Sequence, residues 1–145
     1  MFKADAQPIR WKVHFTSPPD KVFEALATDA GRARYWAESA PEDNGEITFH
    51  FIDHTPVKGR VLEKEPSSFF SVEYFGAIVE FSLESDGNGG TDLTLETTGV
   101  PAEDRTEVIA GWVSVLMAMK AAVDHGVDLR NHDASRAWST GYADN

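Results

Sequence analysis

Hydrophobic residues recur every three or four positions through residues 104–126, and this spacing is typical of an amphipathic helix. Acidic residues stand in its first turn and Gly126 follows its last turn, as expected for the two ends of a helix. At 1.5 Å per residue the helix would be about 33 Å long, enough to cross a small domain. We therefore expect the chain to be organised around it. The residues on its predicted apolar side are Val108, Trp112, Val115, Leu116, Met119 and Val123.

Most of the chain before this helix alternates between apolar and polar residues, which is the pattern of half-buried strands. In residues 9–16 the odd positions are apolar and the even positions are polar. Because one face is apolar and the other is polar, the pattern predicts an antiparallel sheet that is covered on one side. The other predicted strands are residues 46–52, 57–65, 68–75, 77–84 and 92–98.

Residues 17–36 contain signals for two short helices. Ser17 is predicted to cap the first of them, with Pro18 in the first helical position, and Asp29 to cap the second. Further along, the glycines and asparagine of residues 86–90 tolerate positive φ angles and predict a tight hairpin turn. The whole order predicts an α+β fold, in which a curved antiparallel sheet of about six strands wraps around the long C-terminal helix.

The length of 145 residues favours a single domain over residues 1–145, with a core at about 9–126 and a C-terminal tail at 127–145. The formal net charge of −11 opposes binding to nucleic acid or to an anionic membrane surface. The chain contains no cysteine, which excludes disulfides and thiolate chemistry. It shows neither a secretory signal nor an apolar run of about eighteen residues, so we expect a cytoplasmic protein.

The predicted apolar face of the sheet is rich in aromatic residues, and two interpretations of these residues stay open. These side chains either line a pocket for an apolar or aromatic ligand, or simply fill the core. Tyr74, Thr97 and Trp112 would supply polar contacts in a pocket, because each carries one hydrogen-bonding group. The residues predicted to bind a ligand are Trp36, Phe49, Phe51, Phe70, Tyr74, Phe81, Thr97, Trp112, Leu116 and Met119.

Signals for catalysis or metal binding are sparse. His50 and His54 lie at the end of a predicted strand, where side chains four residues apart diverge, so we predict no metal site and no cofactor. Glu63 continues the alternate positions of its strand that are predicted to face the core, so it is a weak candidate for a buried acid or base. The alternative is that the strand has reached its exposed end at Glu63. The chain shows no nucleophile motif and no phosphate-binding loop.

Five segments resemble the START-like superfamily, also called SRPBCC or birch-pollen-allergen-like. Within it, the chain is similar to bacterial homologues of the activator of the heat-shock protein 90 ATPase. The resemblance implies a helix-grip fold with a cavity between the sheet and the long helix. Relatives include lipid carriers, hormone receptors, cyclases and proteins without known activity, and they share no catalytic signature. The matching segments are residues 17–26 (SPPDKVFEAL), 35–36 (YW), 59–66 (GRVLEKEP), 91–95 (TDLTL) and 111–112 (GW).

Residues 130–145 contain Trp138 and Tyr142 among polar residues. Large aromatic side chains need a surface to cover them, so we expect this tail to dock on the domain or on a second subunit. Val113 and Met117 stand on the flank of the predicted long helix and would suit the same contact. A homodimer through the tail and this flank is therefore a further prediction.

Three hypotheses for function follow from these observations. The first is binding of a small apolar or aromatic molecule in the cavity, without built-in catalysis. The second is a cyclase-like or hydrolase-like enzyme that uses the same cavity. The third is an interaction module related to chaperone regulation. A ligand-binding role needs only a cavity, whereas an enzyme also needs an ionisable group inside it.

Overall fold

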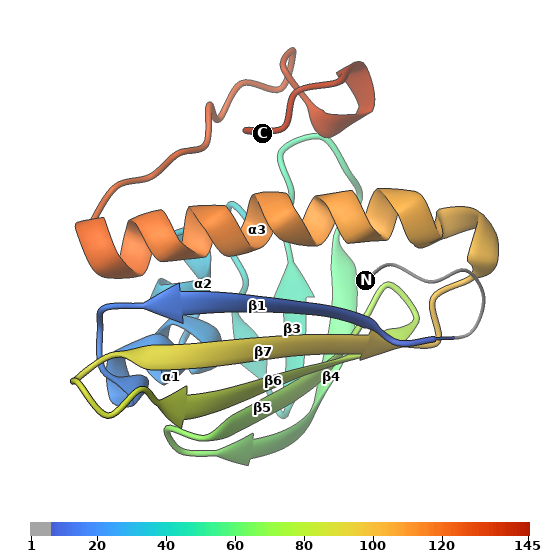
Figure 1. Cartoon of the computed structure of the whole chain (residues 1–145). Helices are drawn as coiled ribbons and strands as arrows, with labels where there is room; N and C mark the ends of the chain where they lie inside the picture. The colour runs from blue at the N-terminus through green and yellow to red at the C-terminus, as the bar shows by residue number, and fades with distance from the viewer. Residues whose placement is uncertain (1–6) are drawn as a thin grey trace.

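A long helix lies across a curved sheet in the computed structural model, which describes residues 7–145 (Figure 1). The C-terminal tail runs back along the outer side of that helix (Figure 1). The elements in chain order are β1 (Ile9–Phe15), α1 (Pro19–Ala27), α2 (Asp29–Ala33), β2 (Glu42–Asp43), β3 (Glu46–Phe49), β4 (Val57–Glu65), β5 (Phe69–Tyr74), β6 (Ala77–Ser85), β7 (Thr91–Thr98), η1 (Ala102–Asp104), α3 (Arg105–His125) and η2 (Trp138–Thr140).

The seven strands form one antiparallel sheet in the order β1-β7-β6-β5-β4-β3-β2. The predicted antiparallel sheet is therefore confirmed, with one strand more than expected. That strand, β2, has only two residues, too few for an alternating pattern to reveal it. The predicted strand 46–52 is shorter in the structure, because the chain leaves the ladder after Phe49 and keeps a single bridge between Ser39 and His50. Residues 51–54 are consequently free to form a loop.

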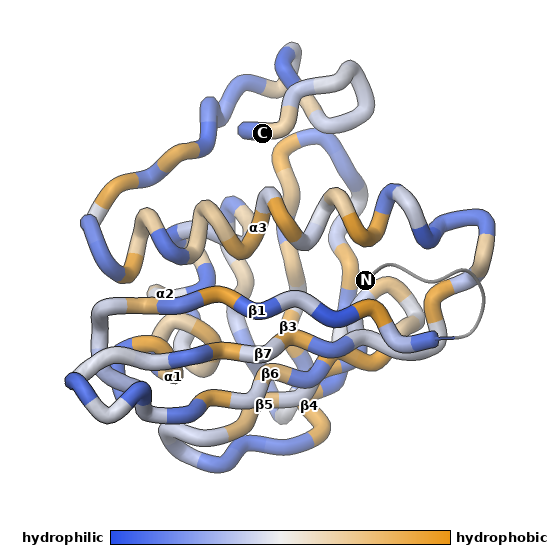
Figure 2. The backbone as a smooth tube through the Cα atoms, viewed as in Figure 1, coloured by the Kyte–Doolittle hydropathy of each residue, from blue (hydrophilic) through white to orange (hydrophobic). Residues whose placement is uncertain are grey.

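The predicted long helix is confirmed as α3. Asp104 is its N-terminal cap residue, and Gly126 ends it with a left-handed φ of 64°, a conformation that suits glycine. Trp112, Leu116 and Met119 are buried on the sheet, as their spacing predicts. Hydrophobic segments run along much of α3, whereas its two ends are hydrophilic (Figure 2).

By length and composition alone, the helical stretch Ala102–His125 is apolar enough to cross a membrane. This is weak evidence for a membrane span, because the core helix of a globular protein meets the same criterion. In this fold the apolar side of α3 packs against β1 and α1. Burial accounts for only part of the hydropathy of α3, because 28% of its apolar window is buried and Val113 and Met117 are 40% and 49% exposed.

At one end of the interface, α1 packs against α3 and the sheet and closes the core. Phe15, Leu26 and Phe70 are fully buried there, and Phe23 of α1 meets Phe70 edge to face with ring centroids 6.5 Å apart. Arg32 of α2 is also fully buried. It donates hydrogen bonds to the carbonyl oxygens of Leu26 and Ala40, both at 2.9 Å, and to Asp29 at 2.8 Å. Burial lowers the pKa of Arg32, and the Asp29 carboxylate opposes that change.

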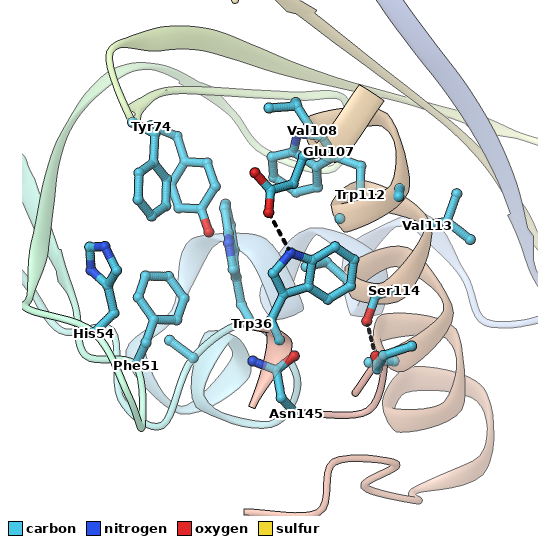
Figure 3. A pocket seen from close by; sticks show the side chains of 18 of the residues that line it. Trp36, Phe51, His54, Tyr74, Glu107, Val108, Trp112, Val113, Ser114 and Asn145 are labelled. Carbon is cyan, nitrogen blue, oxygen red and sulfur yellow. Dashed lines mark hydrogen bonds between the residues drawn. The ribbon is translucent and has the colours of Figure 1, made fainter. Parts of the chain in front are cut away.

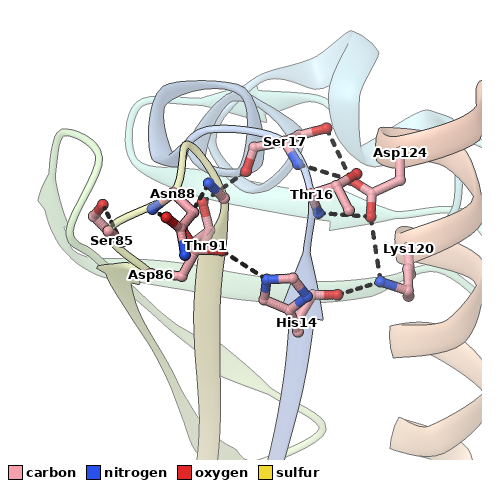
Figure 4. Close-up of polar contacts among 11 residues, drawn as sticks. His14, Thr16, Ser17, Ser85, Asp86, Asn88, Thr91, Lys120 and Asp124 are labelled. Carbon is pink, nitrogen blue, oxygen red and sulfur yellow. Dashed lines mark hydrogen bonds and ion pairs between the residues drawn. The ribbon is translucent and has the colours of Figure 1, made fainter.

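A polar corner ties β1 to the C-terminal end of α3 (Figure 4). The Asp124 carboxylate accepts hydrogen bonds from the Thr16 N–H at 2.9 Å, the Ser17 N–H at 3.1 Å and the Ser17 hydroxyl at 2.8 Å. Lys120 lies 3.3 Å from the same carboxylate. Burial acts to raise the pKa of Asp124, but these hydrogen bonds lower it to about 2. The corner fixes the angle at which α3 crosses the sheet.

The predicted caps of the short helices are wrong in detail. Ser17 does not cap α1, whose cap position is taken by Pro18, because the Ser17 hydroxyl is engaged by Asp124 of α3. For α2 the cap is Thr28 in place of Asp29, and its hydroxyl accepts the Gly31 N–H at 3.0 Å. Tertiary contacts therefore override the local capping preference at Ser17.

The predicted hairpin turn between β6 and β7 is confirmed. Gly87 and Gly89 have φ angles of 83° and 86°. Asp86 closes the turn by accepting hydrogen bonds from the backbone N–H groups of Asn88 at 2.7 Å and Gly90 at 2.9 Å. His14 on β1 lies 2.8 Å from the same carboxylate, which joins this turn to the polar corner (Figure 4).

Candidate ligand-binding site

A cavity of about 1080 Å³ lies at the other end of the interface between sheet and helix (Figure 3). Its walls come from α3, from the loop after β3, from the turn between β5 and β6, and from the C-terminal tail. Apolar side chains predominate, and a few polar groups interrupt them, as in small-molecule sites. The aromatic residues in the wall are Tyr35, Trp36, Phe51, Tyr74, Phe75, Trp112 and Trp138.

Three aromatic rings from different elements meet at the inner wall of the cavity. Trp36 follows α2, Tyr74 ends β5, and Trp112 belongs to α3. The ring centroid of Trp36 lies 5.5 Å from that of Tyr74 and 5.9 Å from that of Trp112, with edge-to-face geometry in both pairs. Such contacts hold the rings in fixed orientations, so the wall is preformed.

Two buried polar atoms in this wall have no hydrogen-bond partner within residues 7–145: Nε1 of Trp36 and Oγ1 of Thr97. The two residues are only 3% and 1% exposed. Burial raises the pKa of the neighbouring Tyr74, and the nearby Trp36 N–H has the opposite, smaller effect. The Trp36 N–H does not meet hydrogen-bond geometry toward that hydroxyl, so its donor is left unsatisfied.

The turn between β5 and β6 forms one side of the cavity mouth. Phe75 and Gly76 both have positive φ angles, of 50° and 77°, as a two-residue hairpin turn requires. A phenylalanine in this conformation is uncommon. The Phe75 side chain is 53% exposed, and its ring stacks on Phe51 at 6.0 Å and meets His54 at 5.7 Å. An exposed aromatic cluster therefore borders the opening.

The C-terminal tail forms the outer wall of the cavity. The indole N–H of Trp138 donates to Glu107 of α3 at 3.1 Å, and the Ser114 hydroxyl donates to the Ala143 carbonyl (Figure 3). Nearer α2, Arg130 donates to the Ala37 carbonyl oxygen at 2.7 Å. The tail thus docks on its own subunit, which is one of the two locations expected from the sequence.

His132 anchors the tail electrostatically. Its ring nitrogens lie 2.8 Å from Asp128 and 2.6 Å from Glu38. Hydrogen bonds to Asp128 and then to Glu38 raise the pKa of His132. For Asp128, burial acts to raise the pKa. Hydrogen bonds from Arg130 and His132 outweigh that effect and hold the pKa of Asp128 well below its usual range. The anchor depends on charge, since the tail buries little apolar surface beyond Ala137.

The charged groups around the cavity are predominantly acidic. Arg130 is the one arginine or lysine among the cavity-lining residues that the structure describes, and it is paired with Asp128 at 3.0 Å. The cavity therefore carries an excess of negative charge, in keeping with the net charge of −11. The acidic residues that line it are Glu38, Asp53, Asp104, Glu107 and Asp144.

The structure divides the ten residues predicted to bind a ligand into two groups. The first group borders the cavity, and the second is buried in the hydrophobic core and does not line the cavity. The cavity is therefore lined by only part of the set of residues that was predicted to bind a ligand. Contact of the first group with a ligand stays a prediction. The residues that border the cavity are Trp36, Phe51, Tyr74, Thr97 and Trp112; those in the core are Phe49, Phe70, Phe81, Leu116 and Met119.

Glu63, the weak catalytic candidate, is exposed and does not border the cavity. A bulge between Val61 and Glu63 shifts the register of β4 against β5, so that Glu63 is paired with Ser71 and Lys64 with Phe70. One extra residue reverses which side chains face the core. The alternation that would point Glu63 toward the core therefore holds only as far as Val61.

The two histidines considered for metal binding have other surroundings. The His54 ring packs against Phe51 and Phe75 at the cavity mouth. His50 lies in the bridge to Ser39. Among the described residues, no group of three or more histidine, cysteine, aspartate or glutamate side chains is arranged to hold a metal ion.

Sequence reasoning missed three parts of the cavity. Phe75 was missed although the Phe75–Gly76 step is a usable turn signal, since glycine after a bulky residue marks a tight hairpin. Gly111 was missed because a glycine in a helix shows its role only when the neighbouring surface is known. The tail was expected to dock, but no pattern in residues 130–145 indicated that it would form a cavity wall.

The curved antiparallel sheet and the long C-terminal helix define a helix-grip protein. A family model described as Activator of Hsp90 ATPase homolog 1-like protein matches residues 16–124, and the chain belongs to that family. The START-like superfamily membership expected from the sequence is confirmed. A comparison with curated proteins finds no significant match.

Solved structures share the fold at low sequence identity. A crystal structure of a Staphylococcus saprophyticus protein has a TM-score of 0.74 and 21% identity, covering 86% of this chain and 96% of that protein. The solution structure of an Aha1 dimer from Colwellia psychrerythraea has a TM-score of 0.73 and 19% identity, covering 83% and 98%. CalU16 from Micromonospora echinospora has a TM-score of 0.66 and 24% identity, covering 79% and 72%. At these identities the similarity establishes the fold.

Proposed function

We propose that this protein binds a small, largely apolar molecule in the cavity beneath its tail and does not transform it chemically. The observation that carries the proposal is the preformed aromatic wall of Trp36, Tyr74 and Trp112 in a cavity of about 1080 Å³. A ligand that buries about 200 Å² of apolar surface gains about 5 kcal/mol at ~25 cal/mol per Å², before the costs of binding. The helix-grip fold is a ligand-binding fold, which supports the same proposal.

The enzyme alternative has less support. Catalysis by proton transfer needs an acid or base held within reach of a substrate, usually with an environment that adjusts its pKa. Glu63 is outside the cavity, and Glu107 is an exposed side chain that accepts a hydrogen bond from Trp138. The chaperone-related alternative is supported by the description of the family alone.

A screen with a blocked cavity tests the proposal. Gly111 lines the cavity, and a Cβ added there would have nothing within 4 Å, so Gly111→Leu places a side chain in the cavity without a backbone clash. Thr106→Leu adds a similar side chain to α3 outside the cavity and is the matched control. Apolar and aromatic metabolites are screened by thermal shift. A ligand at 100 times its Kd stabilises the protein by about 2.7 kcal/mol.

The expected result is that at least one compound raises the melting temperature of the wild type and of T106L, but not of G111L. A compound that stabilises all three proteins equally binds elsewhere and counts against the cavity. If no compound in a broad screen stabilises the wild type, the ligand-binding proposal loses its support.

Self-association is a second proposal with its own test. The Colwellia psychrerythraea relative was determined as a dimer, and apolar side chains such as Leu62 and Ile78 are 45% and 43% exposed here. The tail makes hydrogen bonds to Ser114 and Glu107 of α3 in its own subunit, but Val113 and Met117 on the flank of that helix stay 40% and 49% exposed. We propose a homodimer, and light scattering at high micromolar concentration decides it. A dimer mass that is lost on deleting residues 130–145 would place the tail in the interface, and a monomer mass would contradict the proposal.

A further inference from the structure

We infer that Phe75, in the turn between β5 and β6, is a ligand-binding residue at the mouth of the cavity, and that the ligand has an apolar part that extends to this mouth. The inference rests on the proposed function and deepens it, because it names a binding residue and the reach of the ligand. Two observations carry it, namely the backbone conformation of Phe75 and the exposure of its ring beside the cavity.

The backbone of Phe75 has a conformation that phenylalanine rarely adopts. Two hairpin turns of the chain have almost the same geometry: Asn44 and Gly45 have φ angles of 51° and 78°, and Phe75 and Gly76 have φ angles of 50° and 77°. Asparagine is favoured at the first position of such a turn, because its short polar side chain tolerates positive φ. A bulky side chain is strained there. The requirements of the turn therefore do not explain the phenylalanine.

The core does not explain the phenylalanine either. Phe75 is 53% exposed, which makes it the most exposed large hydrophobic residue within residues 7–145. Its ring centroid lies 4.8 Å from that of Tyr74, 6.0 Å from that of Phe51 and 5.7 Å from that of His54. These contacts fix the ring in place but leave half of the residue uncovered. Such a surface gains free energy when an apolar group covers it.

The surroundings of Phe75 indicate what covers it. Phe51, His54 and Tyr74 all line the cavity and gather on one side of it, and Phe75 belongs to the same lining (Figure 3). Tyr74 also meets Trp112, with ring centroids 5.4 Å apart, so the exposed ring is continuous with the inner aromatic wall. An apolar ligand that lies on this wall and extends to the mouth would cover Phe75. Contact with a ligand thus accounts for an aromatic residue that neither the turn nor the core requires.

A comparison of the two turns tests the inference. The probe is N-phenyl-1-naphthylamine, a neutral aromatic molecule whose fluorescence rises on transfer from water to an apolar site. Titration of the full chain gives its Kd, and thermal melts without the probe give the stability. Phe75→Asn places asparagine in this turn, as in the matching turn, and Phe75→Trp keeps an aromatic ring. Asn44→Phe makes the reverse change outside the cavity lining and is the matched control.

We expect F75N to raise the Kd of the probe about fivefold, on the scale of one aromatic contact. F75W should stay within about twofold of the wild type, because the ring contact is kept. N44F should leave the Kd unchanged and lower the melting temperature by about 2–4 °C, because it introduces the strained conformation without a ligand contact. F75N should melt within about 2 °C of the wild type, since relief of strain offsets the lost ring contacts.

The outcomes separate this inference from the proposed function. An unchanged Kd in F75N would overturn the inference and leave the proposed function standing, because the probe would bind the cavity without this residue. A melting temperature that falls further in F75N than in N44F would also overturn it, since the ring would then serve to hold residues 51–54 in place. A dimer mass that is lost in F75N at unchanged Kd would assign the ring to a subunit interface instead. If the probe does not bind the wild type, the proposed function itself loses support and the inference with it.

Discussion

The two ends of the interface between α3 and the sheet are built from the same elements and differ in how their polar groups are satisfied. At the packed end, Asp124, Ser17 and Arg32 are fully engaged in hydrogen bonds. At the open end, Trp36 and Thr97 hold the two buried side-chain polar atoms of residues 7–145 that lack a partner. The polar groups at the packed end therefore contribute to holding the elements together, whereas these two atoms at the open end do not.

The covering elements explain the contrast. α1 covers the packed end with apolar side chains such as Val22 and Leu26, both fully buried. The tail covers the open end mainly through polar contacts, and its apolar residues Leu129 and Tyr142 remain 50% and 41% exposed. Apolar side chains of α1 therefore fill the space at the packed end, whereas the tail, which is held by polar contacts, leaves the cavity at the open end unfilled.

The largest expected effect comes from a matched pair of leucines. Leu95→Ala in β7 removes a fully buried core side chain and should lower the free energy of unfolding by about 3–5 kcal/mol. Leu129→Ala at the open end removes a half-exposed side chain and should cost less than about 1 kcal/mol. Urea denaturation measures both. Similar losses would show that the tail is as much a part of the core as the sheet.

The second-largest effect is expected at Asp124 in the polar corner. Asp124→Asn should lower the free energy of unfolding by about 1.5–3 kcal/mol at neutral pH, because hydrogen bonds to a charged group are lost. The folded-state pKa of Asp124 is depressed to about 2, so its stabilisation is present above the unfolded pKa of about 4 and disappears as the pH falls toward 2. Stability curves at several pH values should therefore converge for wild type and D124N at low pH. A gap of constant size at pH 2 would contradict this assignment.

A matched pair of glycines probes the free space at the open end. Gly111→Ala should raise the free energy of unfolding by about 0.5–1 kcal/mol, because alanine is the better helix former and its Cβ meets nothing within 4 Å. Gly59→Ala in β4 should instead destabilise the protein by at least about 1 kcal/mol, since its Cβ would lie 1.9 Å from the Glu73 carbonyl oxygen. Thermal melts compare the two, and a loss of stability in G111A would show that the cavity is closed in solution.

The smallest expected effect concerns the tail anchor. The folded-state pKa of His132 is raised, so its stabilisation is complete below the unfolded value of about 6.5 and is lost as the pH rises through the folded value. The ring is 39% exposed, which limits the effect to about 0.5 kcal/mol. Hydrogen exchange of the tail amides should therefore accelerate above neutral pH, after correction for intrinsic exchange, and His132→Gln should abolish that dependence. Unchanged protection in H132Q would show that the charge does not hold the tail.

Much of the fold could be predicted from the sequence, because its signals are local. The apolar spacing of α3 and the glycines of the β6–β7 turn each depend on a few neighbouring residues, and both predictions are confirmed. The site was predicted only in part. The bulge that turns Glu63 outward depends on pairing between strands, and the closure of the core around Phe70 depends on how α1 packs. Neither is encoded in the periodicity of a single segment.

The most direct test of the account follows the indole N–H signals of the four tryptophans by ¹H–¹⁵N NMR during titration with a neutral aromatic probe such as fluorene, with Trp36→Phe used for assignment. Trp11 lies outside the cavity and donates to the Ile109 carbonyl at 3.2 Å, so its signal serves as an internal reference. The account predicts that the Trp36 and Trp112 indole signals shift as the probe packs against the aromatic wall, while the Trp11 signal stays in place. A bound probe that leaves the Trp36 signal unchanged would contradict it.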